Sequence, residues 1–109
     1  MLNCKISFHD EFATIEIEPF FQMVKEAFEA ELQMPAPQHE LHALIEDVTN
    51  NHVDGEWTGA HFTFLVDPQN TAIEFNEDDD GRSVTIPTAK LIQLFKDWNQ
   101  AFPQDEYAL

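Results

Sequence analysis

Residues 61–75, HFTFLVDPQNTAIEF, decide the fold of this chain. Apolar side chains occupy every second position over residues 62–66 and again over residues 72–75. A period of two is typical of β-strands with one buried face, and the sequence DPQN at 67–70 is rich in residues that favour turns. The segment therefore predicts an antiparallel β-hairpin.

The same alternation occurs near the start of the chain, over residues 4–8 and 15–18. It predicts a second hairpin, with residues 9–11 as its turn. Residues 83–86 follow the central hairpin after a polar loop and predict a short additional strand. We therefore expect four to five strands in all.

Three segments, 19–33, 38–50 and 87–102, carry apolar residues at a helical spacing. This spacing places the apolar side chains on one face of each helix. The expected buried positions are Phe20, Val24, Ala27, Phe28 and Leu32 in the first helix, Leu41, Leu44, Ile45 and Val48 in the second, and Leu91, Leu94, Phe95, Trp98 and Phe102 in the third.

Acidic residues and prolines set further expectations for the first helix and its end. Glu26, Glu29 and Glu31 lie mostly off the apolar stripe, so we expect them to face water. Pro35 and Pro37 are expected to end the helix and to form an extended connector, because a residue that precedes proline disfavours helical backbone.

The predicted order of elements is β-β-α-α-β-β-(β)-α. Hairpins between neighbouring strands favour a mostly antiparallel sheet, and three amphipathic helices need a surface on which to bury their stripes. The expected fold class is therefore α+β, with a sheet of four to five strands and three helices packed on one sheet face. Residues 1–109 are expected to form a single domain, because this length matches the common domain size.

The chain carries 21 acidic and 5 basic residues, which gives a formal charge of −16 at pH 7. It also contains ten Phe and an apolar fraction of 43%, so the charge belongs to a folded domain and not to a disordered acidic tail. Such a surface repels nucleic acid and anionic lipid and attracts basic partners. The composition predicts a basic protein partner and no nucleic acid.

Cysteine use and hydropathy bear on the expected location. Cys4 is the single cysteine, which excludes an internal disulfide, and its strand position favours a small buried side chain. Neither a signal peptide nor an apolar run long enough to cross a membrane is visible. We therefore expect a cytoplasmic protein with no membrane association.

Two patterns resemble metal sites but are incomplete. Residues 76–81, NEDDDG, match the opening of an EF-hand calcium loop, but position 12 of that loop requires Glu and holds Pro87. His39, His42 and Glu46 share one helix face, but no further ligand completes a coordination shell. Acidic pairs are too abundant to single out a catalytic one, so we expect no metal, no cofactor and no enzyme activity.

The densest acidic run is the best candidate for a partner-binding surface. It consists of Glu74 on the hairpin and Glu77, Asp78, Asp79 and Asp80 in the loop that follows. Glu56 and Trp57 extend this surface if the fold brings them near. Trp57 has two interpretations that the sequence leaves open, an interface anchor among acidic residues or a cap on the core at a sheet edge.

The second half of the chain is similar to a known group of proteins. A hairpin, an acidic loop and then SVTIPTAKLIQLFKDW at 83–98 resemble small acidic bacterial immunity proteins of contact-dependent growth inhibition and related polymorphic toxin systems. The resemblance covers residues 58–102. It implies stoichiometric inhibition of a toxin domain, often a nuclease, and provides no catalytic residue to transfer.

The leading hypothesis is therefore an immunity protein that binds and neutralises a basic toxin domain. The alternative is a DNA mimic or regulatory adaptor that binds a housekeeping nucleic-acid-binding protein, because carboxylates on a folded surface also fit a cationic groove. The sequence leaves open the oligomeric state and whether binding blocks the active site of the toxin.

Overall fold

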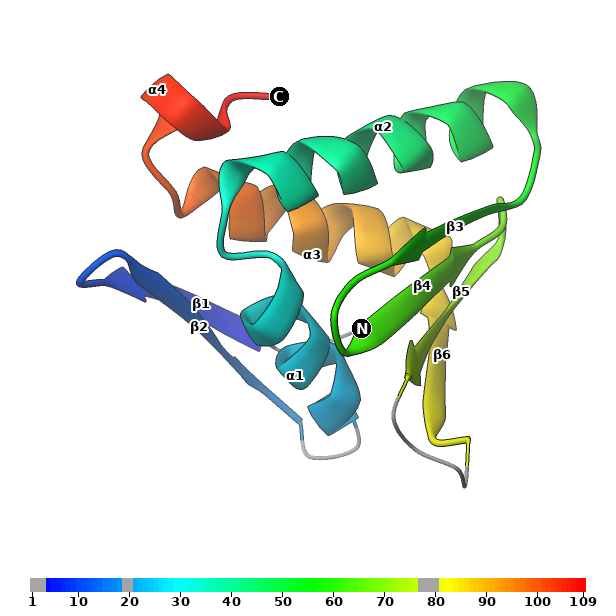
Figure 1. Cartoon of the computed structure of the whole chain (residues 1–109), viewed down its shortest axis with the longest axis horizontal. Coiled ribbons are helices and arrows are strands. Elements are labelled where there is room, and N and C mark those ends of the chain that lie inside the picture. The colour runs from blue at the N-terminus through cyan, green and yellow to red at the C-terminus, as the bar shows by residue number, and fades with distance from the viewer. Residues whose placement is uncertain (1–3, 19–20, 77–80) are drawn as a thin grey trace.

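The structure, a computed structural model, describes residues 4–18, 21–76 and 81–109 (Figure 1). It confirms the α+β class and the predicted order, and it adds the strand β3 and the short helix α4. The elements are β1 (Cys4–His9), β2 (Phe12–Ile17), α1 (Gln22–Glu31), α2 (Pro35–Asn51), β3 (Gly55–Thr58), β4 (Phe62–Val66), β5 (Asn70–Phe75), β6 (Ser83–Pro87), α3 (Thr88–Gln100) and α4 (Gln104–Tyr107).

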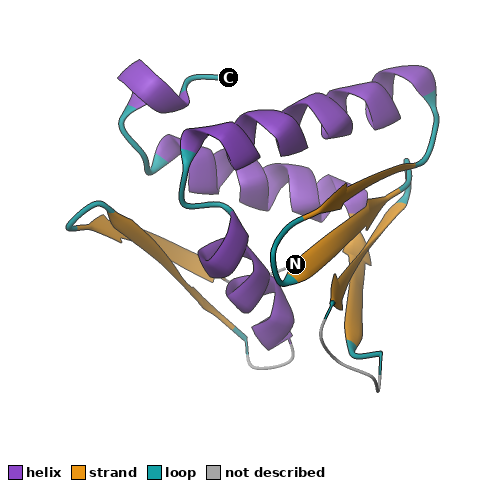
Figure 2. Ribbon diagram, in the orientation of Figure 1, coloured by secondary structure: helices purple, strands orange, loops and turns teal. Residues whose placement is uncertain are grey.

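The strands of the described residues form two antiparallel sheets, whereas the sequence pattern predicts one. β1 pairs with β2, and β3, β4, β5 and β6 form a separate sheet in chain order. Helix α1 lies between the hairpin and the four-stranded sheet, and α2 and α3 lie along one side of both (Figures 1 and 2). Helix α1 therefore separates the two sheets, and α2 and α3 cover them from one side (Figure 1).

The predicted apolar stripes form the core. Every described member is buried except Leu44, which is half-buried; Phe20 lies outside the described residues. Trp98 is fully buried, as expected for a core residue, and its indole Nε1–H donates to the carbonyl of Leu32 at 2.8 Å. Its ring also meets that of Phe28 edge-on, at 5.6 Å between centroids. Residue Trp98 thus joins α3 to the end of α1.

The N-terminal hairpin is confirmed, although its turn contains no glycine. Asp10 and Glu11 connect the strands with φ angles of 54° and 67°. Positive φ at both central positions is the geometry whose twist matches that of the paired strands. Asp10 tolerates this conformation better than Glu11 does, because its short side chain favours left-handed backbone.

The connector predicted at Pro35 and Pro37 is wrong, because both prolines lie in the first turn of α2. The helix begins at Pro35, after Met34 in extended conformation. A proline costs little there, since the first N–H groups of a helix have no partner within it. Met34, which precedes Pro35, is extended, because a residue before proline disfavours helical backbone. The helix begins at Pro35 itself.

Glu31 does not face water, contrary to expectation. Its side chain is 8% exposed, and its carboxylate accepts backbone N–H groups from the turn between β3 and β4. The donors are Ala60 at 3.2 Å, His61 at 2.9 Å and Phe62 at 2.7 Å. A Cβ atom on Gly59 would clash with the carboxylate of Glu31, so glycine permits this close approach. Glu31 therefore fastens the four-stranded sheet to α1.

Replacing Glu31 with Gln should lower the free energy of unfolding by about 2 kcal/mol, because one amide oxygen cannot replace a buried carboxylate that accepts three backbone N–H groups. Glu26→Gln on the exposed side of the same helix is the matched control, with an expected change within about 0.5 kcal/mol. Urea-induced unfolding followed by circular dichroism measures both. Equal stability of the two variants would contradict the role assigned to Glu31.

Candidate functional site

The four-stranded sheet has one face that the helices leave uncovered. Phe62, Phe64 and Val66 of β4 point toward the helices and are buried, and successive side chains of a strand point to opposite faces. The residues between them therefore point outward. This outer sheet face consists of Glu56, Thr58, Thr63, Leu65, Ala72, Glu74, Ser83 and Thr85. Thr63 is buried within it, and its hydroxyl group is hydrogen-bonded to the side chains of Thr58 and Asn76.

Two of the predicted binding residues, Glu56 and Glu74, lie on the outer sheet face, and both are exposed. Glu56 of β3 pairs with Leu65 of β4, and Leu65 pairs with Ala72 of β5. Glu74 lies two residues after Ala72 on β5, so it is two strands and two residues away from Glu56. Strand spacing then places the two backbone positions roughly 12 Å apart. No described basic residue lies on this face, so its charge is negative.

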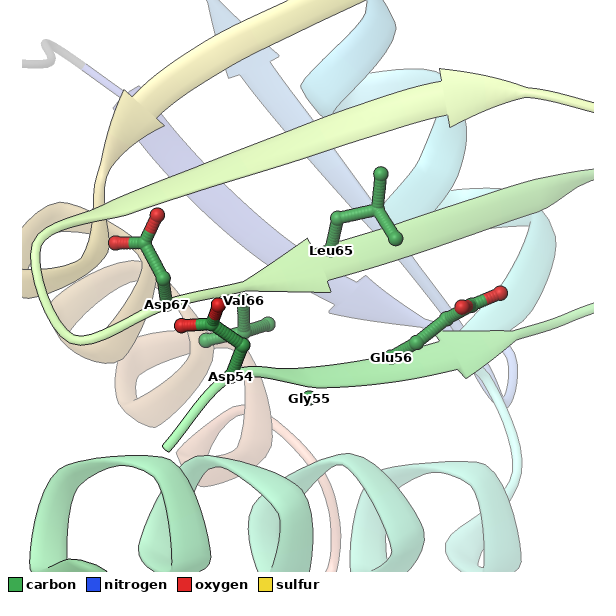
Figure 3. A pocket seen from close by; sticks show the side chains of 6 residues that line it. All are labelled: Asp54, Gly55, Glu56, Leu65, Val66 and Asp67. Atoms are coloured by element: carbon green, nitrogen blue, oxygen red, sulfur yellow. The ribbon is translucent and has the colours of Figure 1, made fainter. Parts of the chain in front are cut away.

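A shallow hollow of about 430 Å³ lies at one end of this face, beside β3 and β4 (Figure 3). Asp54, Glu56 and Asp67 contribute carboxylates to its lining. The carboxylates of Asp54 and Asp67 lie near each other, whereas that of Glu56 points away along β3 (Figure 3). The hollow extends the negative surface of the outer sheet face, but its three carboxylates do not converge on a single position.

Asp67 also has a structural role in the turn between β4 and β5. Its Oδ1 atom accepts the backbone N–H groups of Gln69 at 2.8 Å and Asn70 at 2.6 Å. This is the local bonding by which aspartate stabilises turns. Asp54 makes no such bond among the described residues and is exposed, so it contributes charge alone.

Glu77, Asp78, Asp79 and Asp80 lie outside the described residues. Their segment joins β5 to β6, directly after the strand that carries Glu74. Their part in binding therefore stays a prediction, made from the sequence.

Trp57 lies on the opposite side of β3 from its neighbour Glu56. It shares a row with Phe64 and Ile73, which are fully buried. Its ring meets that of Phe64 edge-on, at 5.9 Å between centroids, and its Nε1–H donates to Glu40 of α2 at 3.0 Å. The half-buried Trp57 thus caps the core at the edge of the sheet, and it does not extend the outer sheet face. A role in partner binding remains a prediction.

The histidines of α2 do not form a metal site with their neighbours. His42 Nε2 lies 3.1 Å from Glu46 Oε1, and the His42 ring stacks on Phe95 at 6.4 Å between centroids. His39 is exposed. Within the part of the chain that the structure describes, no group of three or more His, Cys, Asp or Glu side chains is placed to hold a metal ion. His42 and Glu46 instead line a hollow of about 420 Å³ between α2 and α3.

Cys4 is exposed, so the prediction of a small buried side chain is wrong. It begins β1, and no residue of β1 is fully buried. Partial burial raises the pKa of the Cys4 thiol, and the Asp97 carboxylate of α3 raises it further.

The raised pKa predicts slow alkylation of Cys4 at pH 8, because only the thiolate reacts. Iodoacetamide should modify the native protein more slowly than an unfolded control at the same pH. Asp97→Asn should increase the rate, since it removes a neighbouring negative charge, whereas Asp105→Asn in α4 should leave it unchanged. Identical rates for the wild type and Asp97→Asn would contradict the electrostatic contribution.

Among the described residues, no helix combines the length and the apolar character that crossing a membrane requires. Comparison with protein-family models, with curated proteins and with solved structures finds no match to this chain.

Proposed function

We propose that the chain is an immunity-type inhibitor that acts in the cytoplasm by binding a cationic toxin domain, with a nuclease as the favoured class of toxin. The observation that carries the proposal is the outer sheet face. It is uncovered by any described helix, it holds Glu56 and Glu74, and it belongs to a chain with a formal charge of −16. The resemblance of residues 58–102 to immunity proteins is independent support.

Electrostatics explain how such a face would act. A nuclease must present a cationic groove to its phosphate substrate. A complementary acidic protein is steered to that groove at association rates of up to about 10⁸–10⁹ M⁻¹s⁻¹ at low salt. The threonine, serine and alanine side chains between the carboxylates are short, so a partner surface can approach the sheet closely. Inhibition by this route needs stoichiometric binding and no catalytic residue.

The core fold is consistent with a preformed binding surface. The inner rows of the four-stranded sheet are buried against the helices, and Glu31 fastens one end of it to α1. A partner that docks on the outer sheet face therefore meets backbone that is already held in place. Preorganisation of this kind avoids the entropic cost of ordering a loop on binding.

Co-expression with the product of the neighbouring gene tests the proposal. We expect that product to contain a basic toxin domain, to arrest growth when expressed alone, and to lose its toxicity with this chain. The absence of a toxin-like reading frame beside the gene, together with no protection, would refute the proposal. Capture of an abundant nucleic-acid-binding protein in place of a neighbouring product would favour the DNA-mimic alternative.

Neutralising the outer sheet face should slow association with the toxin domain. Glu56→Gln combined with Glu74→Gln should lower the association rate by a few-fold and flatten its dependence on salt, because the lost carboxylates act mainly by steering. Asp78→Asn, Asp79→Asn and Asp80→Asn together should do the same. Stopped-flow measurements at several salt concentrations give both quantities.

A matched control separates local from global charge. Glu16→Gln with Glu18→Gln makes the same change in net charge at exposed positions outside the four-stranded sheet. This variant should retain most of the wild-type rate. If it slows association as much as the Glu56 and Glu74 pair does, the toxin responds to total charge and the outer sheet face is not its docking site.

A further inference from the structure

The two edges of the β1–β2 hairpin differ in how their backbone groups are satisfied. An exposed edge presents unpaired N–H and C=O groups that can pair with another strand, and proteins usually block it. Here one edge is blocked by side chains of α1 and its C-terminal extension, whereas the other is open.

The blocked edge belongs to β2. The side-chain amide of Gln33 accepts from the N–H of Ala13 at 3.0 Å and donates to its carbonyl at 2.8 Å. Two residues further along the strand, Glu29 accepts from the N–H of Ile15 at 2.9 Å and Lys25 donates to its carbonyl at 3.0 Å. These side chains occupy the position of a neighbouring strand.

The same bonds fix the orientation of β1. The backbone N–H and C=O groups of successive residues in an antiparallel strand point to opposite sides. Those of Ala13 and Ile15 point toward α1, so those of Phe12, Thr14 and Glu16 point toward β1. Their partners in the register include Ser7, opposite Thr14. The alternate residues of β1 therefore point their N–H and C=O groups outward, and no described residue is hydrogen-bonded to these groups. They are Cys4, Ile6 and Phe8.

The other sheet has edges of a different character. β3 is only four residues long and carries an acidic residue, Glu56. β6 ends at Pro87, which has no N–H to donate. β1 spans six residues, CKISFH, without proline and without a carboxylate. Its one formal charge is Lys5, a residue type that also discourages edge pairing, and it is the longest open edge strand in the described part of the chain.

We propose that β1 pairs with β1 of a second copy of this chain, antiparallel and about a two-fold axis at Ile6. The two hairpins then form a continuous four-stranded sheet across the dimer. In this register Ile6 pairs with Ile6 of the other copy, Cys4 pairs with Phe8, and Lys5 lies opposite Ser7. Each of the outward-pointing residues exchanges N–H···O bonds with its counterpart.

Charge favours a second copy over the basic partner proposed above. Acids make up 21 of the 109 residues, yet β1 contains none and instead carries Lys5. A basic strand would meet Lys5 at this edge and no carboxylate of β1. When the two strands pair about Ile6, Lys5 lies opposite Ser7 of the other copy, so no like charges face each other. Pairing about Lys5 would instead place the two Lys5 side chains opposite each other, which is unfavourable.

Burial supports the same pairing. Ile6 and Phe8 are only half-buried, and Cys4 is exposed, although all three lie on the side of the strand that faces the core. Phe8 rests on Phe102 with its ring centroid 5.0 Å away. Pairing about Ile6 would cover these side chains with their counterparts and extend the apolar layer beneath α3.

Sedimentation equilibrium of the full chain tests the dimer directly. We expect a concentration-dependent monomer–dimer equilibrium that strengthens as salt rises, because two chains of charge −16 repel each other at long range. A toxin complex would show the opposite dependence on salt. A chain that remains monomeric at all soluble concentrations in high salt would overturn the proposal.

Two substitutions at one exposed position provide a matched test of the register. Ser7→Lys should weaken the dimer because it places a second cation opposite Lys5, and Ser7→Glu should strengthen it. Each pair occurs twice about the two-fold axis, so the dissociation constant should change by roughly two- to thirty-fold in either direction. Ser7 faces Thr14 within the monomer, so folding should be unaffected.

Ile6→Pro tests the hydrogen bonds themselves. It removes an outward N–H that the hairpin does not use, and it should yield a folded monomer by circular dichroism and sedimentation. A dimer that is unchanged by Ile6→Pro and by both Ser7 variants would lie on another surface and would overturn the proposal. Loss of toxin binding in the Ser7→Lys variant, with no change in self-association, would overturn it as well by assigning the edge to the toxin.

Discussion

The structure depends on the carboxylate of Glu31, which gathers three backbone N–H groups from the turn between β3 and β4. The same short stretch of chain holds the other sheet through Gln33, Glu29 and Lys25, which bond to the backbone of β2. Helix α1 and the residues after it thus contact both sheets by polar bonds while its apolar stripe fills the core. Among the described residues, the outer sheet face and the edge of β1 stay uncovered, and these are the surfaces for which we propose partners.

The acidic residues divide into two kinds once their partners are known. Glu29, Glu31, Glu40 and Asp67 bond to backbone or to side chains within the fold, so they are part of its construction. Glu56 and Glu74 project from the outer sheet face, where Glu56 also accepts a hydrogen bond from the exposed hydroxyl of Thr58 at 3.1 Å. Fewer carboxylates are therefore available to a partner than the formal charge of −16 suggests. The proposed binding surface depends more on where the exposed carboxylates lie than on how many there are.

Periodicity predicted the α+β class, the helical stripes and both hairpins, because burial of apolar side chains dominates those features. It missed Glu31, since a carboxylate off the apolar stripe is assigned to solvent unless a specific backbone partner is known. It missed β3 because Gly55–Thr58 contains one apolar side chain, Trp57, too few to show a period. Successive side chains of a strand point to opposite faces. Because the strand β3 was not predicted, there was no reason to expect that Glu56 and Trp57 point in opposite directions.

The most direct test of where the partner docks is the change in backbone amide chemical shifts of the ¹⁵N-labelled chain when the proposed toxin partner is added. We expect changes concentrated on the outer sheet face, at Glu56, Thr63, Glu74 and Thr85, with small changes on α2 and α3. Changes confined to the hollow between α2 and α3, with those four amides unmoved, would contradict this expectation.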